Sequence, residues 1–378
     1  MKKIAIIGAS ELQNPLIEKA HQMGLETHVF AWKVGDIGES TADFFYPISI
    51  TETDAIEAEC RRIGIDGICT IASDLANVTV GAVSHHLGLP GNSPACVYAS
   101  TNKQAMRACF AAHGDPSPRS IPVHAGETPD LEGWAFPLIV KPIDRSGSRG
   151  VTRLDSIEGL EEALSAAFES GFQATALIEE YAQGDEYSFE FCSFEGTHHL
   201  LAATKKFTTG APHFIEMGHM EPSGLSPATL DAAQRVLSHA LDSLEVQTGA
   251  SHAEMKIDSD GTMNIIEIGS RMGGDCIGSD LVPLTTGIDF TRAVIDCALG
   301  RKPNLTPAHV CAFAVVKYLF NQYDLDILAS VSQNHPKWIV RSSSIQAIDH
   351  EVSDSSTRFG FFVMALDNEP DLAYLELK

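Results

Sequence analysis

The first hundred residues alternate short apolar runs with helix-length amphipathic segments, and this alternation constrains the fold more than any other feature. Strands are predicted at residues 4–7, 27–31 and 67–71, and helices at residues 15–23, 55–62 and 75–87. Strands that alternate with single helices pair in a parallel sheet, because each helix carries the chain back along the sheet in a right-handed crossover. Residues 1–100 are therefore expected to form an α/β domain around a parallel sheet.

The rest of the chain mixes strands and helices in another order, which predicts an α/β fold class that is α+β overall. Predicted strands occupy residues 136–141, 175–180, 187–194, 199–204, 250–258 and 262–268, and predicted helices occupy residues 157–169 and 227–244. The last two strands flank an Asp-Ser-Asp-Gly turn, which is typical of a hairpin. After residue 303 only short strands are indicated, at residues 310–320, 337–340 and 359–366, so we predict a small C-terminal β-rich unit. The expected domains are residues 1–100, 101–300 and 301–378.

The charge of the chain excludes several functions. Its 378 residues carry 26 Lys and Arg against 50 Asp and Glu, a net charge of −24, whereas general binders of nucleic acid or anionic membranes need excess basic residues. No apolar stretch approaches the ~20 residues that cross a bilayer, and the N-terminal apolar run ends at Ser10-Glu11, too early for a signal peptide. The eight cysteines form no CxxC pair, as expected for reduced thiols. We therefore expect a cytoplasmic protein that binds neither nucleic acid nor membrane.

A basic, glycine-rich loop follows the predicted strand at residues 136–141. Residues 141–153 hold four basic side chains against Asp144 alone, a local charge of +3 in an acidic chain. Backbone N–H groups and hydroxyls in such a loop can surround phosphates, while a lysine at the strand end supplies a point charge. The candidate phosphate contacts are Lys141, Ser146, Gly147, Ser148 and Gly150. The alternative interpretation is a basic turn on the surface.

A second candidate segment ends the strand at residues 175–180. Glu179, Glu180 and Tyr181 close the strand, and Glu186 follows a turn that contains glycine. An extended hinge of this kind can present its backbone to the edge of an adenine ring, and a carboxylate can accept two hydrogen bonds from ribose hydroxyls. Taken alone, the segment also fits a strand end with solvated acids.

The hairpin at residues 250–268 places one glutamate on each strand among apolar neighbours, Glu254 and Glu267. A buried carboxylate is costly unless it is paired or bound to a metal ion, and Mg²⁺ prefers a few oxygen ligands together with water and phosphate. Arg271 follows the second glutamate and could hold an anionic oxygen in bidentate fashion. A salt bridge between Glu267 and Arg271 is the alternative, and His252 is expected to have a packing or supporting role.

These three segments, in this order, resemble the ATP-grasp superfamily of carboxylate–amine ligases over residues 1–300. Within that superfamily, residues 8–17, 203–223 and 267–274 look like the bacterial L-amino acid ligases that make dipeptides. The resemblance implies an ATP-grasp fold in which the first domain is Rossmann-like and the nucleotide lies between two α+β subdomains, with a hinge near residues 179–186. Many superfamily members have Asn two residues after the second glutamate, whereas this chain has Gly269, which leaves the ligands of a second metal ion open.

The resemblance also implies roles for individual residues. The nucleotide contacts would be Lys103, Lys141, Ser146, Gly147, Ser148, Gly150, Glu179, Tyr181, Ala182, Glu186 and Lys206. The metal ligands would be Glu254 and Glu267, the catalytic residues Arg271, Lys141 and Glu267, and the substrate contacts Glu216, His219, Arg271 and Gly273. From the residues alone Lys103 is only a lysine near a helix start, and strand alternation allows only one of Lys205 and Lys206 to face the site.

The function implied is ATP-dependent amide formation between L-amino acids through an acyl phosphate, with release of ADP and phosphate. The expected cofactors are ATP and two Mg²⁺ ions, for which Mn²⁺ can substitute, and a homodimer is a family-level expectation. One alternative is an ATP-grasp ligase that joins an amino acid to a different small carboxylate or amine, and another is an ATP-binding protein without catalysis. No general base for the amine is identified, although Asp275 and Asp280 are candidates by position.

Overall fold

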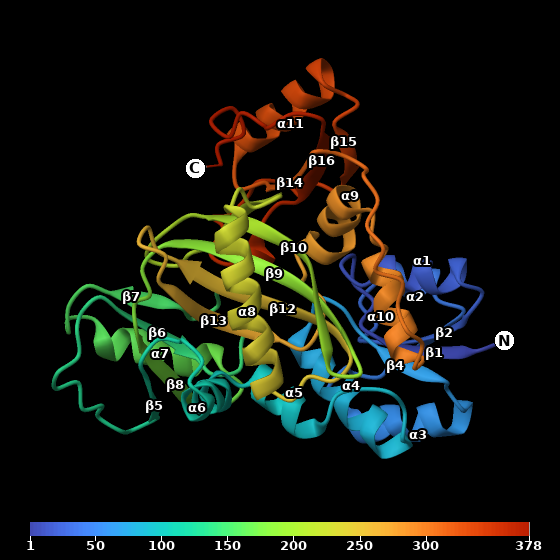
Figure 1. Cartoon of the computed structure of the whole chain (residues 1–378), viewed down its shortest axis with the longest axis horizontal. Helices are drawn as coiled ribbons and strands as arrows, with labels where there is room; N and C mark the ends of the chain where they lie inside the picture. The colour runs from blue at the N-terminus through green and yellow to red at the C-terminus, as the bar shows by residue number, and fades with distance from the viewer. Residues whose placement is uncertain (378) are drawn as a thin grey trace.

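The N-terminal domain is built on the parallel sheet that its sequence pattern predicts. The computed structural model describes residues 1–377, and its first sheet has the strand order β3-β2-β1-β4, with every neighbouring pair parallel (Figure 1). The strands are β1 (Lys3–Ile7), β2 (Glu26–Phe30), β3 (Phe44–Tyr46) and β4 (Gly67–Cys69). The helices of this domain are α1 (Asn14–Gln22), α2 (Ile37–Thr41), α3 (Thr53–Ile63) and α4 (Asp74–Leu87).

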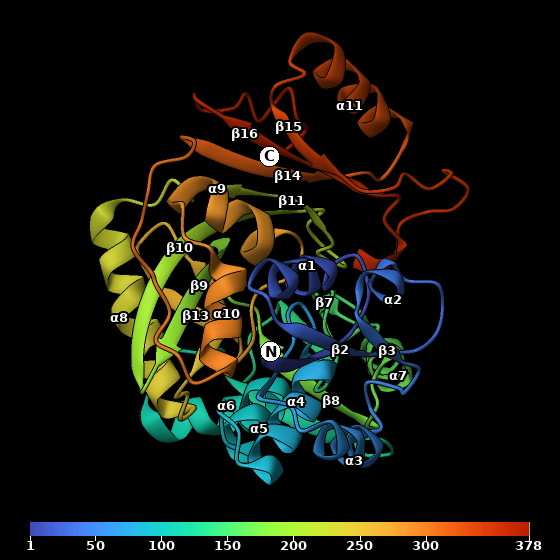
Figure 2. The same ribbon diagram turned by 90° about the vertical axis from the view of Figure 1, so that its right-hand side faces the viewer.

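The core of this domain includes a helix from much later in the chain. α10 (Phe290–Ala298) packs against α1 and β4, and its Phe290 and Ile295 lie in the same apolar cluster as Ile4 and Ile6. Figure 2 shows α10 beside the N-terminal sheet. The domain boundaries at 100/101 and 300/301 stay a prediction, but the first core draws on residues from both sides of the central region.

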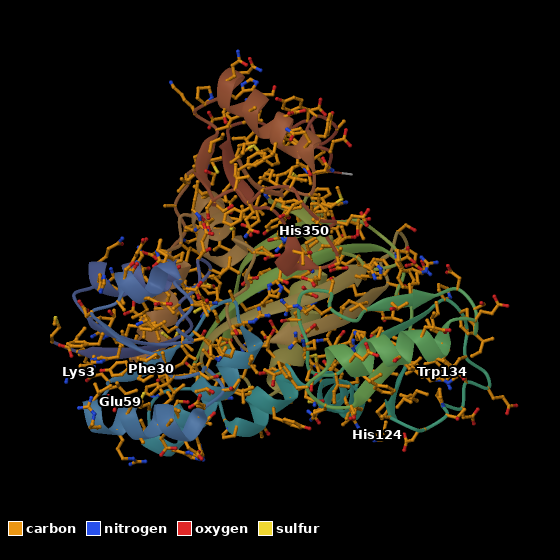
Figure 3. All side chains as sticks on the ribbon, turned by 180° about the vertical axis from the view of Figure 1, so that it is seen from behind. Lys3, Phe30, Glu59, His124, Trp134 and His350 are labelled. Carbon is orange, nitrogen blue, oxygen red and sulfur yellow. The ribbon has the colours of Figure 1, made fainter. Side chains whose placement is uncertain are left out.

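A small antiparallel sheet forms one half of the central region. Its order is β5-β8-β6-β7, from β5 (Ser120–His124), β6 (Leu138–Pro142), β7 (Thr152–Leu154) and β8 (Thr175–Glu180). α7 (Leu160–Ser170) packs on it, and α5 (Pro94–Thr101) and α6 (Lys103–His113) connect it to the first domain. In Figure 3, His124 and Trp134 mark this sheet, and Lys3 and Phe30 mark the N-terminal domain.

An eight-stranded antiparallel sheet, the large sheet, joins the other half of the central region to the C-terminal unit. Its order is β13-β12-β9-β10-β11-β14-β16-β15. The strands are β9 (Asp185–Phe194), β10 (Thr197–Thr208), β11 (Glu216–Glu221), β12 (Gly249–Ile257), β13 (Met263–Gly269), β14 (Phe313–Tyr318), β15 (Ile339–Ser342) and β16 (Phe361–Leu366). The remaining elements around it are α8 (Pro227–Ser243), η1 (Ile277–Leu281), α9 (Val282–Thr286), α11 (Gln322–Asn334) and η2 (Ser355–Thr357).

The two faces of the large sheet differ in chemistry because side chains alternate along each strand. Phe189, Ala253 and Met255 lie on the apolar face, in a cluster with Leu237 and Leu241 of α8, the helix that crosses this face in Figure 1. On these strands the side chains at the alternate positions point to the opposite face, which we call the polar face. They include Glu186, Ser188, Glu190, Thr204, Lys206, His219, Glu221, His252, Glu254 and Glu267.

The C-terminal unit contains a helix that the sequence analysis missed. The prediction of short strands alone was wrong, because α11 lies between β14 and β15. Asn321 caps this helix by accepting hydrogen bonds from the N–H groups of Tyr323 and Asp324, and Ile327 and Val331 face the C-terminal core. The β14–β16 strands extend the large sheet, so this unit is continuous with the central region.

Two further features of residues 1–377 concern the cysteines and the helices. All eight cysteines are free thiols, and seven of them are buried. No helix in the described part of the chain is both long enough and apolar enough to span a bilayer.

Candidate active site

The polar face of the large sheet carries the two glutamates predicted as metal ligands. Glu254 on β12 and Glu267 on β13 are direct cross-strand partners. The next pair joins Met255 to Ile265, so Ile266 is an extra residue, and such a bulge bends a strand locally. Directly opposed carboxylates repel each other unless a cation lies near them.

Lys206 on β10 supplies one such cation. Its Nζ lies 2.6 Å from Glu254 Oε1, 2.7 Å from Glu186 Oε1 and 3.8 Å from Glu216 Oε1. Burial alone lowers the pKa of Lys206, but the nearby carboxylates outweigh burial and hold the pKa well above its usual value. Lys205 points the other way and pairs with Asp185 at 2.7 Å. The structure therefore selects Lys206 as the lysine that faces the site.

Lys103 supplies a second cation. It is the first residue of α6, whose N-cap is Asn102, and its Nζ lies 2.9 Å from Glu267 Oε1. The same Nζ donates to the backbone carbonyl of Arg145 at 2.7 Å, within the basic loop. Lys103 therefore links the second candidate metal ligand to the loop predicted to hold phosphate.

Lys141 and Glu179 meet in a buried cluster that also includes Arg107. Lys141 Nζ lies 2.6 Å from Glu179 Oε2, and Arg107 Nε lies 2.7 Å from Glu179 Oε1. Burial alone raises the pKa of Glu179, but Arg107 and Lys141 outweigh it and lower the pKa. Arg107 Nη2 also donates to the carbonyl of Ile266 at 2.7 Å, at the bulge. The Glu179 carboxylate is thus held by two cations, so its backbone is the part left to contact an adenine ring.

The glycine-rich loop and the hinge lie close to the polar face. Ser148 Oγ donates to the carbonyl of Phe214 at 3.1 Å, and Lys256 Nζ donates to the hydroxyl of Tyr181 at 3.0 Å. A Cβ on Gly147 would lie 3.6 Å from Ser355 of the C-terminal unit. In the same segments Ser146 is exposed, and Gly150 and Ala182 are half-buried. The predicted nucleotide contacts therefore lie where the small sheet approaches the large sheet.

His252 and Glu190 support the metal-ligand side of the site. His252 Nδ1 bonds to a carboxylate oxygen of the fully buried Glu190, and His252 Nε2 lies 3.3 Å from Glu254 Oε1. The other oxygen of Glu190 accepts a hydrogen bond from the backbone N–H of Gly273 at 3.0 Å. A Cβ at Gly273 would lie 2.5 Å from Glu190 Oε1, so only glycine fits there. This contact fixes His252 in the supporting role expected from the sequence.

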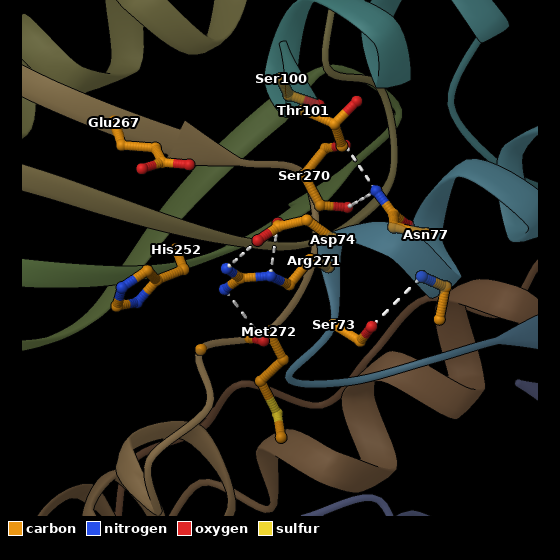
Figure 4. A network of polar contacts seen from close by, with 12 residues as sticks. Ser73, Asp74, Asn77, Ser100, Thr101, His252, Glu267, Ser270, Arg271 and Met272 are labelled. Carbon is orange, nitrogen blue, oxygen red and sulfur yellow. Dashed lines mark hydrogen bonds and ion pairs between the residues drawn. The ribbon is translucent and has the colours of Figure 1, made fainter. Parts of the chain in front are cut away.

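Arg271 pairs with Asp74 of the N-terminal domain. Arg271 Nε lies 2.8 Å from Asp74 Oδ1, and Arg271 Nη2 lies 2.9 Å from Asp74 Oδ2 (Figure 4). The alternative salt bridge between Glu267 and Arg271 does not form among the described residues, since Glu267 pairs with Lys103. Asp74 was not identified from the sequence.

Two of the four predicted substrate contacts, Glu216 and His219, form a separate group beside Lys206. Glu216 accepts a hydrogen bond from Ser355 Oγ, and His219 is buried with no hydrogen-bond partner on either ring nitrogen. Burial lowers the pKa of His219, although Asp275, 3.8 Å from its Nε2, acts in the opposite direction. Buried polar atoms without a partner are rare in folded proteins, so His219 is suited to contact a ligand.

The two aspartates considered as bases for the amine are both held by arginines from the C-terminal unit. Asp275 receives two hydrogen bonds from Arg358, at 2.8 and 3.0 Å, and Asp280 receives two from Arg341, at 3.2 and 3.3 Å. Asp275 also has a positive φ of 52°, an uncommon conformation for a residue with a side chain. Of the two, Asp275 lies beside His219, so it is the one that remains a candidate.

The carboxylates fit the requirements of Mg²⁺ better than those of a closed protein site. Among residues 1–377 no group of three or more His, Cys, Asp and Glu has the arrangement of a metal site. Mg²⁺ usually takes one or two carboxylates and completes its shell with water and substrate phosphates. Glu254 and Glu267, opposed on neighbouring strands, match that limited ligand set.

One cavity of the described structure lies elsewhere. It has a volume of about 450 Å³ and is lined by His199, Thr285, Leu305 and His309, among others, at the start of β10 and beside α9. The predicted site residues do not line it, so we assign the candidate site from the charged residues and not from this cavity.

Comparison with known proteins identifies the central region. Residues 134–279 match the family model described as the ATP-grasp domain. The chain carries an ATP-grasp domain. The match includes most of the residues predicted to bind nucleotide and metal, from Lys141 to Arg271, but not Lys103. Asp74, the partner of Arg271, also lies outside it.

Curated relatives of this ATP-grasp protein are distant and longer. An uncharacterised protein of Sinorhizobium fredii is 27% identical over 269 residues, covering 68% of this chain and 55% of that protein. The alanine–anticapsin ligase of Bacillus subtilis is 26% identical over 300 residues, covering 69% and 62%. The D-alanine–D-alanine ligase of Aromatoleum aromaticum is 27% identical over 213 residues, covering 53% and 67%. The chain thus spans only 55% and 62% of the length of the first two of these relatives.

Solved structures share the fold of the ATP-grasp protein over its whole length. The L-amino acid ligase of Bacillus licheniformis has a TM-score of 0.83 and 23% identity, covering 100% of this chain and 96% of that chain. An N5-carboxyaminoimidazole ribonucleotide synthetase in complex with ADP has a TM-score of 0.79 and 16% identity, covering 99% and 94%. At these identities the likeness concerns the fold. The prediction of an ATP-grasp fold is confirmed.

Proposed function

We propose that this chain is an ATP-dependent carboxylate–amine ligase that joins two L-amino acids through an acyl phosphate, releasing ADP and phosphate. The observation that carries the proposal is the convergence of Lys103 and Lys206 on the facing carboxylates Glu267 and Glu254, beside the loop that follows Lys141. ATP binds together with a metal ion and carries several negative charges. A site for it therefore needs cationic side chains near the phosphates and carboxylates near the metal ion.

In this proposal the lysines bind the phosphates, and Ser146, Gly147, Ser148 and Gly150 cover them. Glu254 and Glu267 would hold Mg²⁺, with two ions expected and Mn²⁺ able to substitute. The metal, when bound, neutralises charge that develops between the attacking carboxylate and the leaving ADP. Closure of the glycine-rich loop would exclude water, which otherwise hydrolyses an acyl phosphate.

Arg271 would contact the transferred phosphoryl group, and Glu216 and His219 would bind the amino acid. A carboxylate can accept hydrogen bonds from an ammonium group, and a neutral imidazole can accept or donate one. Asp275 is proposed as the group that orients His219, because it remains ionised beside Arg358: burial alone raises its pKa, but Arg358 outweighs burial and lowers it. We further propose a homodimer in the cytoplasm, with small molecules as its substrates.

A second candidate is a ligase that joins an amino acid to a different small carboxylate or amine. It is supported by the relatives named alanine–anticapsin ligase, whose printed name combines an amino acid with another acid. An ATP-binding protein without catalysis is disfavoured, because binding alone does not need Glu254, Glu267 and Arg271 together.

The test is release of ADP and phosphate across a panel of L-amino acids, offered singly and in pairs, with mass spectrometry of the products. Release that needs two amino acids, with a dipeptide mass, supports the proposal. Release that needs one amino acid and a different acid or amine supports the second candidate. No release under any condition, in a chain that still binds ATP, contradicts both.

A further inference from the structure

The pairing of Arg271 with Asp74 joins a predicted catalytic residue to a domain that lies outside the ATP-grasp match. The two nitrogens Nε and Nη2 each face one carboxylate oxygen, at 2.8 and 2.9 Å, which is the bidentate geometry that fixes a guanidinium in one plane. The two residues lie 197 positions apart in the sequence. Figure 4 shows the pair where the loop after β13 meets the start of α4, with His252 and Glu267 to one side of it.

Asp74 is itself held in place by the start of α4. It is the first residue of this helix, and Ser73 caps the helix by accepting a hydrogen bond from the N–H of Ala76 at 3.2 Å. A carboxylate in the first turn interacts favourably with the partial positive charge of the helix N-terminus. The acceptor for Arg271 is therefore anchored by local structure as well as by the pair.

The loop that carries Arg271 is fastened to the same domain on both sides. Asn77 Nδ2 donates to Ser270 Oγ at 3.0 Å, and the N–H of Ala72 donates to the carbonyl of Met272 at 3.1 Å. Ile71 and Met272 also form a short parallel bridge. The backbone of residues 270–272 is thus fixed, and the guanidinium has little freedom to move away from Asp74.

Gly269 supplies the space that the pair occupies. A Cβ at this position would lie 3.0 Å from Asp74 Oδ1 and 3.3 Å from Arg271 Cζ, which is too tight for an undisturbed pair. A larger side chain there, such as the asparagine expected from the superfamily, would have to displace the pair. The glycine and the ion pair are therefore two parts of one arrangement.

We propose that Asp74 is a positioning residue for the ligase reaction: by binding Nε and Nη2 it orients the Arg271 guanidinium so that its remaining N–H groups meet the transferred phosphoryl oxygen. The proposal rests on the proposed function. Nη1 makes only a long contact of 3.4 Å to the carbonyl of Met272, so it is free to donate elsewhere. Donors that are fixed before the reaction stabilise developing charge without reorganisation, which is why the orientation matters.

The test is a double-mutant cycle with Asp74→Asn, Arg271→Gln and both together. Asp74→Asn should lower kcat by about 10- to 100-fold and leave the KM for ATP within about twofold, because a supporting residue acts through the group it orients. The double variant should be no slower than Arg271→Gln alone. Lys19→Gln is the matched control, because it breaks another long-range ion pair, to Asp289 at 2.8 Å, and should leave kcat unchanged.

Losses that multiply in the double variant overturn the proposal, and so does an unchanged kcat with a lowered melting temperature in Asp74→Asn, which indicates a structural role only. Gly269→Ala adds an independent arm: crowding of the pair should lower kcat in the same direction, and a normal kcat counts against the proposal.

Failure of the proposed function can be told apart from failure of this inference. Suppose that no amino acid causes the wild-type chain to release ADP. In that case calorimetry measures the affinity for ADP with Mg²⁺ and aluminium fluoride, which mimics a phosphoryl group in transfer. Aluminium fluoride should increase the affinity for ADP, and this increase should be reduced equally in Asp74→Asn, Arg271→Gln and the double variant. Additive losses, or no gain in the wild-type chain, overturn the inference.

Discussion

The ammonium group of Lys206 lies 2.6 Å from the carboxylate of Glu254, across the polar face of the large sheet. One residue is predicted to bind phosphate and the other to bind metal, so the two charges that a magnesium nucleotide needs are already neighbours. Binding of the nucleotide would exchange this ion pair for contacts of each group with the ligand. The pair therefore sets a specific expectation for variants of each residue.

Lys206→Met should weaken ATP binding by roughly 10- to 100-fold, because a hydrogen bond to a charged group contributes about 1.5–3 kcal/mol. Lys205→Met is the matched control, since Lys205 is adjacent but pairs with Asp185 away from the site. Calorimetry with ATP and Mg²⁺ measures both. Equal losses in the two variants would refute the assignment of Lys206.

Glu267→Gln and Glu254→Gln should each lower ADP release by at least about two orders of magnitude, because the amide is a poor ligand for Mg²⁺ and does not replace the lost charge. Glu162→Gln, an exposed residue of α7, is the control and should retain activity. The measurement is steady-state ADP release over a range of Mg²⁺ concentrations. Near-normal turnover in either site variant would contradict the metal assignment.

Glu221 should make the stability of the protein depend on pH. It is fully buried and accepts hydrogen bonds from Thr204 and Thr285, and burial raises its pKa to about 8. The raised pKa means that its contribution to stability is complete below the pKa of the unfolded state, about 4.3, and is lost as pH rises through 8.

Across that window the free energy of unfolding of the wild-type chain should fall by about 1.4 kcal/mol for each pH unit relative to Glu221→Gln, which keeps the shape of the protonated acid. Urea unfolding of both proteins between pH 5 and pH 8 measures the difference. Parallel stability curves would show that Glu221 does not take up a proton on folding in this range.

Asp324→Asn should destabilise the C-terminal unit. Lys317 is fully buried on β14, and its Nζ lies 2.6 Å from Asp324 Oδ1 on α11. Removal of one partner leaves a buried charge without compensation, which costs about 3–5 kcal/mol. Urea unfolding should show that loss for Asp324→Asn and none for Asp326→Asn, an exposed residue on the same helix.

Local periodicity predicted much of the fold. The alternation of strands with helices correctly indicated the parallel N-terminal sheet. Alternation along a strand indicated that only one of Lys205 and Lys206 can face the site, and in the structure Lys206 is the one beside Glu254. α11 was missed even though Asn321 begins it and Ile327 and Val331 repeat at helical spacing, because the short strands around it dominated the pattern.

The partners of the site residues could not be predicted in the same way. Arg107, Glu190 and Asp74 have no local signature, and each acts through a contact with a residue more than 60 positions away. Ser73 followed by Asp74 indicates only a helix start. The pairing with Arg271 depends on how two domains meet, which a pattern of neighbouring residues does not contain.

The place of α10 in the first core also affects how the protein is made. During synthesis from the N-terminus the strands of the first sheet leave the ribosome long before α10 does. Until α10 is made, the apolar surface of β4 and α1 that it covers stays exposed. A nascent chain in that state is open to aggregation or to capture by a chaperone. The same surface would be exposed in a fragment of the first hundred residues, which would therefore need residues 290–298 to be soluble.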